Sequence, residues 1–280
     1  MENYSHSRIA CYMMCPEKYR LRYIDHVVPT KKAKPLALGS CMAEGLASFR
    51  EEGDQEAAQE VFMKTWVDGD RVLEVSKEDD PLRSVERGLE ILNEYMLTYP
   101  DDPKEFIHPE VRFDEEIMDG VRFRGRIDGI IAIGDDVALV EDKTASRLGP
   151  FYFKQLGDSY QIKWYMAIAK KLGLFDLSKK KVPRCLMNVS YIHPTTFRFE
   201  RQITPKTGAL LDESLERLKD WIRQIQFATR EMLFPKGDSE TCLKYGGCEY
   251  LPLRDASPSI KASLLKNEYM IEEPSTGERK

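Results

Sequence analysis

The chain of 280 residues lacks any long apolar segment. No apolar run approaches the roughly 20 residues that a helix needs to cross a bilayer, which argues against a membrane-spanning protein. The first residues, MENYSHSRIACYMMCPEKYR, also lack the charged start and purely apolar stretch of a secretory signal. We therefore expect a cytoplasmic protein with no membrane partner.

A strong net charge is also missing, because 42 Lys and Arg stand against 47 Asp and Glu, a net of −5. The sign nevertheless changes along the chain. Residues 44–120 carry 23 acidic and 8 basic side chains, whereas residues 141–187 carry 10 basic and 4 acidic ones. Local charge attracts a polyanion even where the total charge is negative, so a nucleic-acid partner is not excluded. If the basic segments share one face, DNA would be drawn to that face.

The pattern of apolar residues divides the chain into three parts. Helical spacing predicts a helical region over residues 1–104, and apolar–polar alternation with turn signals predicts an α/β core over 105–203. A long helix and a cysteine-containing segment follow over 204–253. We predict that these parts form a single domain and that the polar residues 254–280 form a loose tail.

The predicted fold class is α/β, with a mixed central sheet flanked by helices. An antiparallel meander of three strands comes first. A helix over 159–172, a returning strand over 184–192 and an edge strand over 196–203 follow it. The strands of the meander are expected at Phe106–Met118, Val121–Ile133 and Val137–Lys143.

Two carboxylates and an ammonium group are expected to meet on this meander. Asp128 interrupts the apolar run of the second strand, and the third strand ends in Glu141, Asp142 and Lys143. The turn between the strands brings Asp128 near Glu141. Glu141 and Lys143 project from one face because they are two residues apart, and Asp142 points to the other face. Such a cluster is costly when it is dry and unpaired, and a divalent cation would remove that cost.

Magnesium fits this cluster, because Mg²⁺ accepts one or two carboxylates and keeps waters and phosphate oxygens at its other positions. Lys143 could orient or deprotonate a metal-bound water that attacks a phosphodiester. On the following helix, Gln161 and Tyr165 are four residues apart and share a face, so they could contact a base, a phosphate or that water. The alternatives are a core aromatic for Tyr165 and an exposed ion pair for Glu141 and Lys143.

The order and spacing of these residues resemble the RecB-like branch of the PD-(D/E)XK nuclease superfamily, on Asp128, Glu141-Asp142-Lys143 and Gln161-x3-Tyr165. The N-terminal SRIACYMMCPEKYRLRY is similar to that branch's opening motif, with Cys15-Pro16 and Tyr19 at matching positions. The segments VEDKTASRLG and YQIKWYMAIA are closest in texture to phage-encoded exonucleases. The resemblance implies a restriction-endonuclease-like core with an N-terminal helical region.

The activity that this resemblance implies is that of a metal-dependent DNA exonuclease. It would hydrolyse linear DNA, single- or double-stranded, in recombination or repair. Mg²⁺ or Mn²⁺ would be held by Asp128, Glu141 and the backbone carbonyl of Asp142. Lys143 would be the catalytic lysine, and Gln161 with Tyr165 would be the motif on the adjacent helix.

Candidates for DNA contacts lie at two places. Arg147 follows the catalytic strand closely, and its position makes it a candidate for a phosphate contact. Tyr19 belongs to the opening motif, so the resemblance makes it a second candidate.

One departure from the resemblance concerns the metal site. This branch usually carries a metal-binding His within G-x-x-x-H-E, whereas the chain has Gly39-Ser40-Cys41-Met42-Ala43-Glu44, with Ala43 at the His position. Glu44 lies about 100° further around the helix, which makes it a poor substitute. Glu110 on the first strand is another possible carboxylate, and a water could also fill the position.

A second departure concerns the cysteines. Relatives often hold an iron–sulfur cluster with one Cys in the opening motif and three near the C-terminus. Cys15, Cys242 and Cys248 match, but Ser239 or Arg254 replaces the remaining one, depending on register. Cys11, one helical turn from Cys15, could supply a fourth thiolate. An intact cluster, a zinc ion and plain thiols are the three alternatives.

Two other functions remain open from the sequence. Because Ala43 replaces the usual His, the protein could be a catalytically weakened DNA-binding member of the same fold. The acidic helical region could instead serve as an interface for a recombination partner protein.

Overall fold

The computed structural model describes residues 1–30, 34–68, 80, 82–175, 182–237, 239–243 and 247–272. The chain separates into two compact units. Unit 1 consists of Met1 and Ala33–Leu218, and unit 2 consists of Glu2–Lys32 and Lys219–Lys280. The boundary within the second half of the chain falls inside helix α9 (Gly208–Arg230).

Three long helices of unit 1 precede its sheet: α3 (Lys34–Glu52), α4 (Gln55–Asp68) and α5 (Val85–Thr98). The hydroxyl of Ser84 caps α5 by accepting from the backbone N–H of Arg87, as serine does at helix N-termini. One apolar cluster joins the three helices because each turns a buried stripe toward it. Its fully buried members include Leu38, Phe62, Leu92, Tyr95 and Met96.

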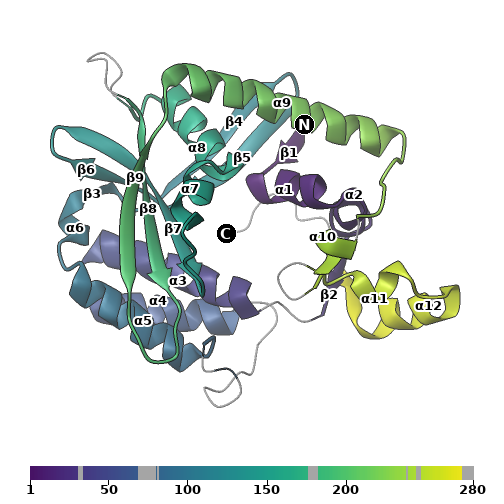
Figure 1. Cartoon of the computed structure of the whole chain (residues 1–280), viewed down its shortest axis with the longest axis horizontal. Helices are drawn as coiled ribbons and strands as arrows, with labels where there is room; N and C mark the ends of the chain where they lie inside the picture. The colour runs from purple at the N-terminus through teal and green to yellow at the C-terminus, as the bar shows by residue number, and fades with distance from the viewer. Residues whose placement is uncertain are drawn as a thin grey trace. The chain divides into compact units, whose positions relative to one another are not determined.

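A five-stranded mixed sheet is the centre of unit 1 (Figure 1). Its strands are β3 (Phe106–His108), β6 (Gly129–Ile133), β7 (Asp136–Ala145), β8 (Arg184–Tyr191) and β9 (Phe199–Pro205). Their order is β3-β6-β7-β8-β9. Strands β7 and β8 run parallel, and the other neighbours are antiparallel. The mixed sheet with flanking helices confirms the predicted fold class.

The expected three-stranded meander is wrong in one respect, because its chain divides between two sheets. Strands β4 (Val111–Met118) and β5 (Val121–Ile127) pair with each other outside the central sheet. The central sheet takes β3, from the start of the first predicted strand, together with β6 and β7. The break falls at Asp128. Gly129 follows with a φ of 156°, and a Cβ there would lie 2.5 Å from the Phe106 ring, so only glycine lets the chain turn at this place.

Helices cover both faces of β7. Helix α3 contacts β7, and α7 (Tyr152–Gly157) and α8 (Tyr160–Lys171) contact the same part of the sheet. Alternation along β7 separates the two sides, since Asp142 bonds to α3 and Lys143 bonds to α8. The short helix α6 (Asp102–Glu105) precedes β3.

Unit 2 assembles segments from the two ends of the chain. Its N-terminal elements are β1 (Glu2–Tyr4), α1 (His6–Met14), α2 (Pro16–Tyr19), the π-helix η1 (Arg20–Ile24) and β2 (Val27–Pro29). Its C-terminal elements are α10 (Ser239–Leu243), α11 (Leu251–Arg254), α12 (Pro258–Asn267) and β10 (Tyr269–Ile271).

The expected loose tail differs from the structure over most of its length. Strand β10 pairs antiparallel with β2, and Tyr269 joins Leu21, Val27, Tyr250 and Leu253 in one apolar cluster. Burial of the Tyr269 ring fixes the segment around β10 in place, although the composition of this segment is polar. Residues 273–280 of the tail lie outside the described residues. Across the described ranges, no helix is both long and apolar enough to span a membrane.

Candidate active site

Strand β7 carries the first part of the site. Glu141 and Lys143 project from one face, and the Glu141 side chain is only 1% exposed. The ammonium of Lys143 donates to Oε1 of Glu141 and, at 3.2 Å, to Oε1 of Gln161 on α8. Ser159 caps α8 through the backbone N–H of Ile162, which places Gln161 in the first turn. The lysine therefore lies between a buried carboxylate and a side-chain amide.

Asp128 joins this group from the corner between β5 and β6. Its Oδ2 accepts a hydrogen bond of 3.0 Å from the backbone N–H of Asp142. Pairing between β6 and β7 ends at Gly129 and Val140, so this edge of β7 is open to the Asp128 side chain beyond that point. The structure thus brings Asp128, Glu141, Lys143 and Gln161 together.

Burial disfavours the ionised forms of the two carboxylates, Asp128 and Glu141. Burial raises the pKa of Asp128 to about 8, with repulsion from Glu141 and Asp142 adding to the effect. Burial also raises the pKa of Glu141, although the charge of Lys143 opposes the change. A single ammonium does not compensate both buried carboxylates, so the site favours an additional cation.

A hard divalent cation fits these donors. Oε2 of Glu141 is buried, and no residue that the structure describes gives it a hydrogen bond. That oxygen and the carboxylate of Asp128 are donors of the type that hard divalent cations bind. The described parts of the chain hold no group of three His, Cys, Asp or Glu side chains suited to a metal. Two carboxylates are sufficient for Mg²⁺, which keeps several waters.

Comparison with known proteins assigns the chain to a family. The family model of the PD-(D/E)XK nuclease superfamily matches residues 3–253, a range that includes every residue of the site. The chain belongs to this superfamily. Its members are nucleases that use divalent metal ions, which agrees with the donors around Asp128 and Glu141.

A solved structure shares the fold of this superfamily member. It is a protein from Eubacterium rectale described as a "putative exonuclease", with 14% sequence identity and a TM-score of 0.51. The match covers 84% of each chain. At this identity the likeness shows the restriction-endonuclease-like fold alone. No curated protein matches the chain at a significant level.

Tyr165, the second member of the helix motif, lies in the core of the nuclease fold. Its ring makes an edge contact with Phe113, at a centroid distance of 5.3 Å, and packs near Phe123. Its hydroxyl oxygen would lie 2.9 Å from a Cβ at position 125, so Gly125 makes the approach of the two elements possible. Burial raises the pKa of Tyr165. The residue anchors α8 on the β4–β5 hairpin.

Ala43, at the position where the RecB-like branch that the sequence resembles usually carries a His, is half-buried on α3. Gly39 and Ala43 line a small pocket together with Asp142, Lys143 and Thr144. Ala43 therefore lies next to strand β7, but its side chain offers no metal-binding atom.

The two additional carboxylates are engaged by one arginine. The Arg126 guanidinium pairs with Glu44 and, at 3.0 Å, with Oε2 of Glu110. Glu110 also accepts from Arg112 at 2.7 Å. These contacts occupy both acids with guanidinium groups, so in this structure they do not supplement Asp128 and Glu141 as metal ligands.

The two DNA-contact candidates have opposite environments. Arg147 is exposed in the loop after β7. Tyr19 is fully buried in unit 2, where Nε of Arg8 donates to its hydroxyl at 3.0 Å and the Phe234 ring stacks on it. The prediction that Tyr19 contacts DNA is thus wrong for this structure, because its ring belongs to the core of unit 2.

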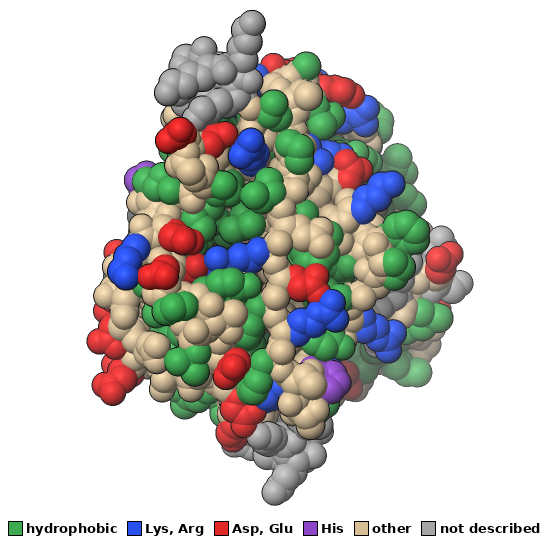
Figure 2. Space-filling model, turned by 60° about the vertical axis from the view of Figure 1, so that its left-hand side comes forward, with side chains coloured by type: hydrophobic (Ala, Val, Ile, Leu, Met, Phe, Trp, Pro, Cys, Tyr) green, Lys and Arg blue, Asp and Glu red, His purple; other side chains and the backbone are tan. Residues whose placement is uncertain are grey.

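The charge pattern on the surface is mixed. Figure 2 shows Lys and Arg side chains interspersed with Asp and Glu on the face that it draws. That face is not the basic face expected from the charge of residues 141–187.

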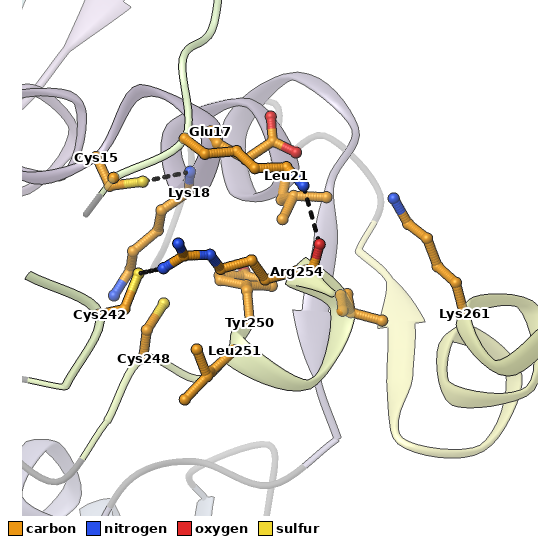
Figure 3. Close-up of a pocket in the computed structure, with 13 residues that line it drawn as sticks. Cys15, Glu17, Lys18, Leu21, Cys242, Cys248, Tyr250, Leu251, Arg254 and Lys261 are labelled. Atoms are coloured by element: carbon orange, nitrogen blue, oxygen red, sulfur yellow. Dashed lines mark hydrogen bonds between the residues drawn. The ribbon is translucent and has the colours of Figure 1, made fainter. Parts of the chain in front are cut away.

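Three cysteines of unit 2 line one pocket: Cys15, Cys242 and Cys248 (Figure 3). The guanidinium of Arg254 donates to Sγ of Cys242 at 3.1 Å. Burial raises the pKa of Cys11 to about 12. Among the described residues, no three His, Cys, Asp or Glu side chains are placed to hold a metal ion, so these cysteines do not fit the four-thiolate site of an iron–sulfur cluster.

Sequence reasoning missed the residues behind the site. Arg50, at the end of α3, is 1% exposed and pairs with Asp142 at 2.5 Å. Asn188 of β8 also donates to Asp142, at 2.6 Å. A lone Asn within the apolar strand RCLMNVSY was a visible signal of a buried polar partner. Arg50 gave no such signal, because a basic residue in the last turn of a helix is ordinary.

Proposed function

We propose that the protein is a metal-dependent DNA exonuclease that hydrolyses the phosphodiester bonds of linear DNA. The observation that carries this proposal is the position of Lys143, between the buried carboxylate of Glu141 and Gln161 and on the strand bonded to Asp128. A reacting phosphate is an anion, and an ammonium held by a buried carboxylate is a fixed donor for it.

Three groups would hold the metal: the carboxylates of Asp128 and Glu141 and the backbone carbonyl of Asp142. When bound, Mg²⁺ or Mn²⁺ supplies charge neutralisation at the phosphate and an acidified water as nucleophile. Lys143 orients the phosphate or the attacking water, and Gln161 holds Lys143 in place through its amide oxygen. Burial of Glu141 keeps bulk water away from one side of the site.

The finer identity of the enzyme is part of the same proposal. The motif order supports a RecB-like nuclease similar to phage-encoded exonucleases, with a role in recombination or repair. The exposed Arg147, in the loop after β7, is the candidate for a phosphate contact.

End-labelled linear DNA and closed circular DNA of the same sequence provide the test. We expect release of mononucleotides or short products from the linear DNA only, with Mg²⁺ or Mn²⁺ required. Lys143→Met keeps the length of the side chain without its charge and should lower the rate by about 100-fold or more. Equal degradation of the circle would contradict the exonuclease, and equal rates in the two proteins would contradict the role of Lys143.

A further inference from the structure

A buried network of polar side chains lies on the face of β7 opposite to Glu141 and Lys143. Its members come from α3, α5, α6, β7, β8 and β9, and their charges balance. They are Arg50, Tyr95, Asp102, Asp142, Asn188 and Arg201. Buried charges destabilise a protein unless they are paired and hydrogen-bonded. Because each of these side chains depends on its partners, the network holds them in one arrangement.

Arg50 is the member that reaches two parts of the active site at once. Its Nη1 donates to Oδ2 of Asp142 at 2.5 Å and to the backbone carbonyl of Asp128 at 3.2 Å. Its Nη2 donates to Oδ1 of Asp142 at 2.9 Å and to the hydroxyl of Tyr95 at 3.1 Å. The guanidinium also lies 4.1 Å from the ring centre of Phe106, which packs on Gly129.

We propose that Arg50 is a positioning residue, whose guanidinium fixes Asp128 relative to the strand that carries Glu141 and Lys143. The inference rests on the proposed function. Asp128 stands at a bend between two sheets, so regular strand pairing does not fix it there. Two links hold it to β7: the hydrogen bond from the N–H of Asp142, and the bridge from its own carbonyl through Arg50 to the side chain of Asp142.

Only a planar, forked donor set can make this bridge. A lysine ammonium could keep one contact to Asp142, but it cannot donate in parallel to both carboxylate oxygens and to the Asp128 carbonyl. Residues that orient metal ligands from behind typically change metal affinity or activity by about 10- to 100-fold when they are replaced. Arg50→Lys should therefore weaken metal binding while the charge of the network is preserved.

Arg201 provides a matched control within the same network. Its Nη2 donates to both oxygens of Asp102, at 2.7 and 2.6 Å, and to the Tyr95 hydroxyl at 2.8 Å. Its Nε donates to Oδ1 of Asn188 at 3.1 Å. Its guanidinium lies 3.6 Å from the ring centre of Tyr99. Among the described contacts it has no hydrogen bond to Asp128 or Asp142. Arg201→Lys thus disturbs another buried arginine–aspartate pair of the same network and leaves the direct contacts of Arg50 with Asp142 and Asp128 in place.

The experiment measures Mn²⁺ binding by titration calorimetry on the full chain without DNA, for the unaltered protein, Arg50→Lys and Arg201→Lys. Thermal unfolding of each protein without metal reports the loss of stability. We expect Kd for Mn²⁺ to rise about tenfold or more in Arg50→Lys and less than threefold in Arg201→Lys, at similar losses of stability. Equal Kd values in the unaltered protein and Arg50→Lys, or equal increases in both variants, would overturn the positioning role alone. An unaltered protein that binds no Mn²⁺ would overturn the proposed function as well.

A second variant covers the case in which Arg50→Lys does not fold. The double substitution Arg50→Met with Asp142→Leu removes both charges, and such replacements of buried pairs are often neutral or stabilising. The backbone of Asp142 remains, but the Asp128 carbonyl loses its donor. The double variant should fold, and its Kd for Mn²⁺ should be about tenfold or more above that of the unaltered protein. Binding as tight as in the unaltered protein would overturn the inference.

Discussion

The backbone N–H of Asp142 donates a 3.0 Å hydrogen bond to the carboxylate of Asp128, although the two residues are 14 positions apart. This contact joins the bend between two sheets to the strand that carries Glu141 and Lys143. Burial, with repulsion from Glu141 and Asp142 adding to it, raises the pKa of Asp128. Ionised Asp128 at this position therefore costs stability, and a bound cation would offset that cost.

The first prediction concerns that cost. Asp128→Asn keeps an oxygen that can accept from the N–H of Asp142, but it removes a charge that burial and Glu141 disfavour. We expect the metal-free variant to gain about 1 kcal/mol of unfolding free energy, the usual scale of relieving an unfavourable charge. Added Mn²⁺ should raise the unfolding temperature of the unaltered protein much more than that of the variant. Thermal unfolding at one pH, with Mn²⁺ and with a chelator, measures both effects. A less stable metal-free variant would contradict the electrostatic account.

A second prediction concerns the position of the missing histidine. Ala43 lines the small pocket beside Asp142 and Lys143, so we expect an imidazole at this position to add a donor near the proposed metal ligands. Ala43→His should tighten Mn²⁺ binding and raise activity at low metal concentration, by about tenfold. Ala43→Leu matches the bulk without a donor and serves as the control.

The result also separates two readings of the protein. Tighter Mn²⁺ binding and higher activity in Ala43→His, with neither in Ala43→Leu, would indicate that the natural enzyme works with one metal ligand fewer. Absence of cleavage in the unaltered protein, together with salt-sensitive DNA binding, would favour a catalytically weakened DNA-binding protein.

The third prediction concerns Tyr165. Its ring packs against Phe113 and Phe123 beneath α8, which is the position of a core residue. Tyr165→Phe should lose about 0.5–1.5 kcal/mol of stability, the usual contribution of one hydrogen bond, and keep most of its activity. Tyr165→Ala should lose about 3–5 kcal/mol, as for other large aromatic deletions. Urea unfolding with parallel nuclease assays tests this. A folded Tyr165→Phe protein with a 100-fold lower rate would show that the hydroxyl takes part in the chemistry.

The fourth prediction concerns the thiols of unit 2. Because Arg254 donates to Cys242 and Cys11 is held as a thiol, we expect the purified protein to be colourless and to contain no stoichiometric iron or zinc. Cys248, which is half-exposed, should react with an alkylating reagent before the buried Cys11 and Cys242 do. Elemental analysis and mass spectrometry of the alkylated protein measure both. Iron at the stoichiometry of a [4Fe–4S] cluster would contradict this prediction.

The sequence alone determined those features that depend on local pattern. Helical spacing predicted helices ahead of the sheet, where α4 and α5 lie, and strand alternation put Glu141 and Lys143 on one face with Asp142 on the other. Alternation with period two is a property of the strand itself, so it needs no knowledge of the neighbours. The order of Asp128, Glu141, Lys143 and Gln161 was sufficient to indicate the superfamily that the family model confirms.

Only the tertiary structure decided what bonds to these residues. A strand from residue 121 to residue 133 and two strands broken at Asp128 give almost the same apolar pattern, and the left-handed turn at Gly129 is what separates them. Arg50 looked like an ordinary basic residue at a helix end until folding placed it against Asp142, 92 positions away. The apolar cluster around Tyr269 likewise ordered a segment whose composition predicted a loose tail. In each case the stabilisation comes from burial and pairing between segments that are distant in the sequence. A local sequence pattern does not show which distant residues will be these partners.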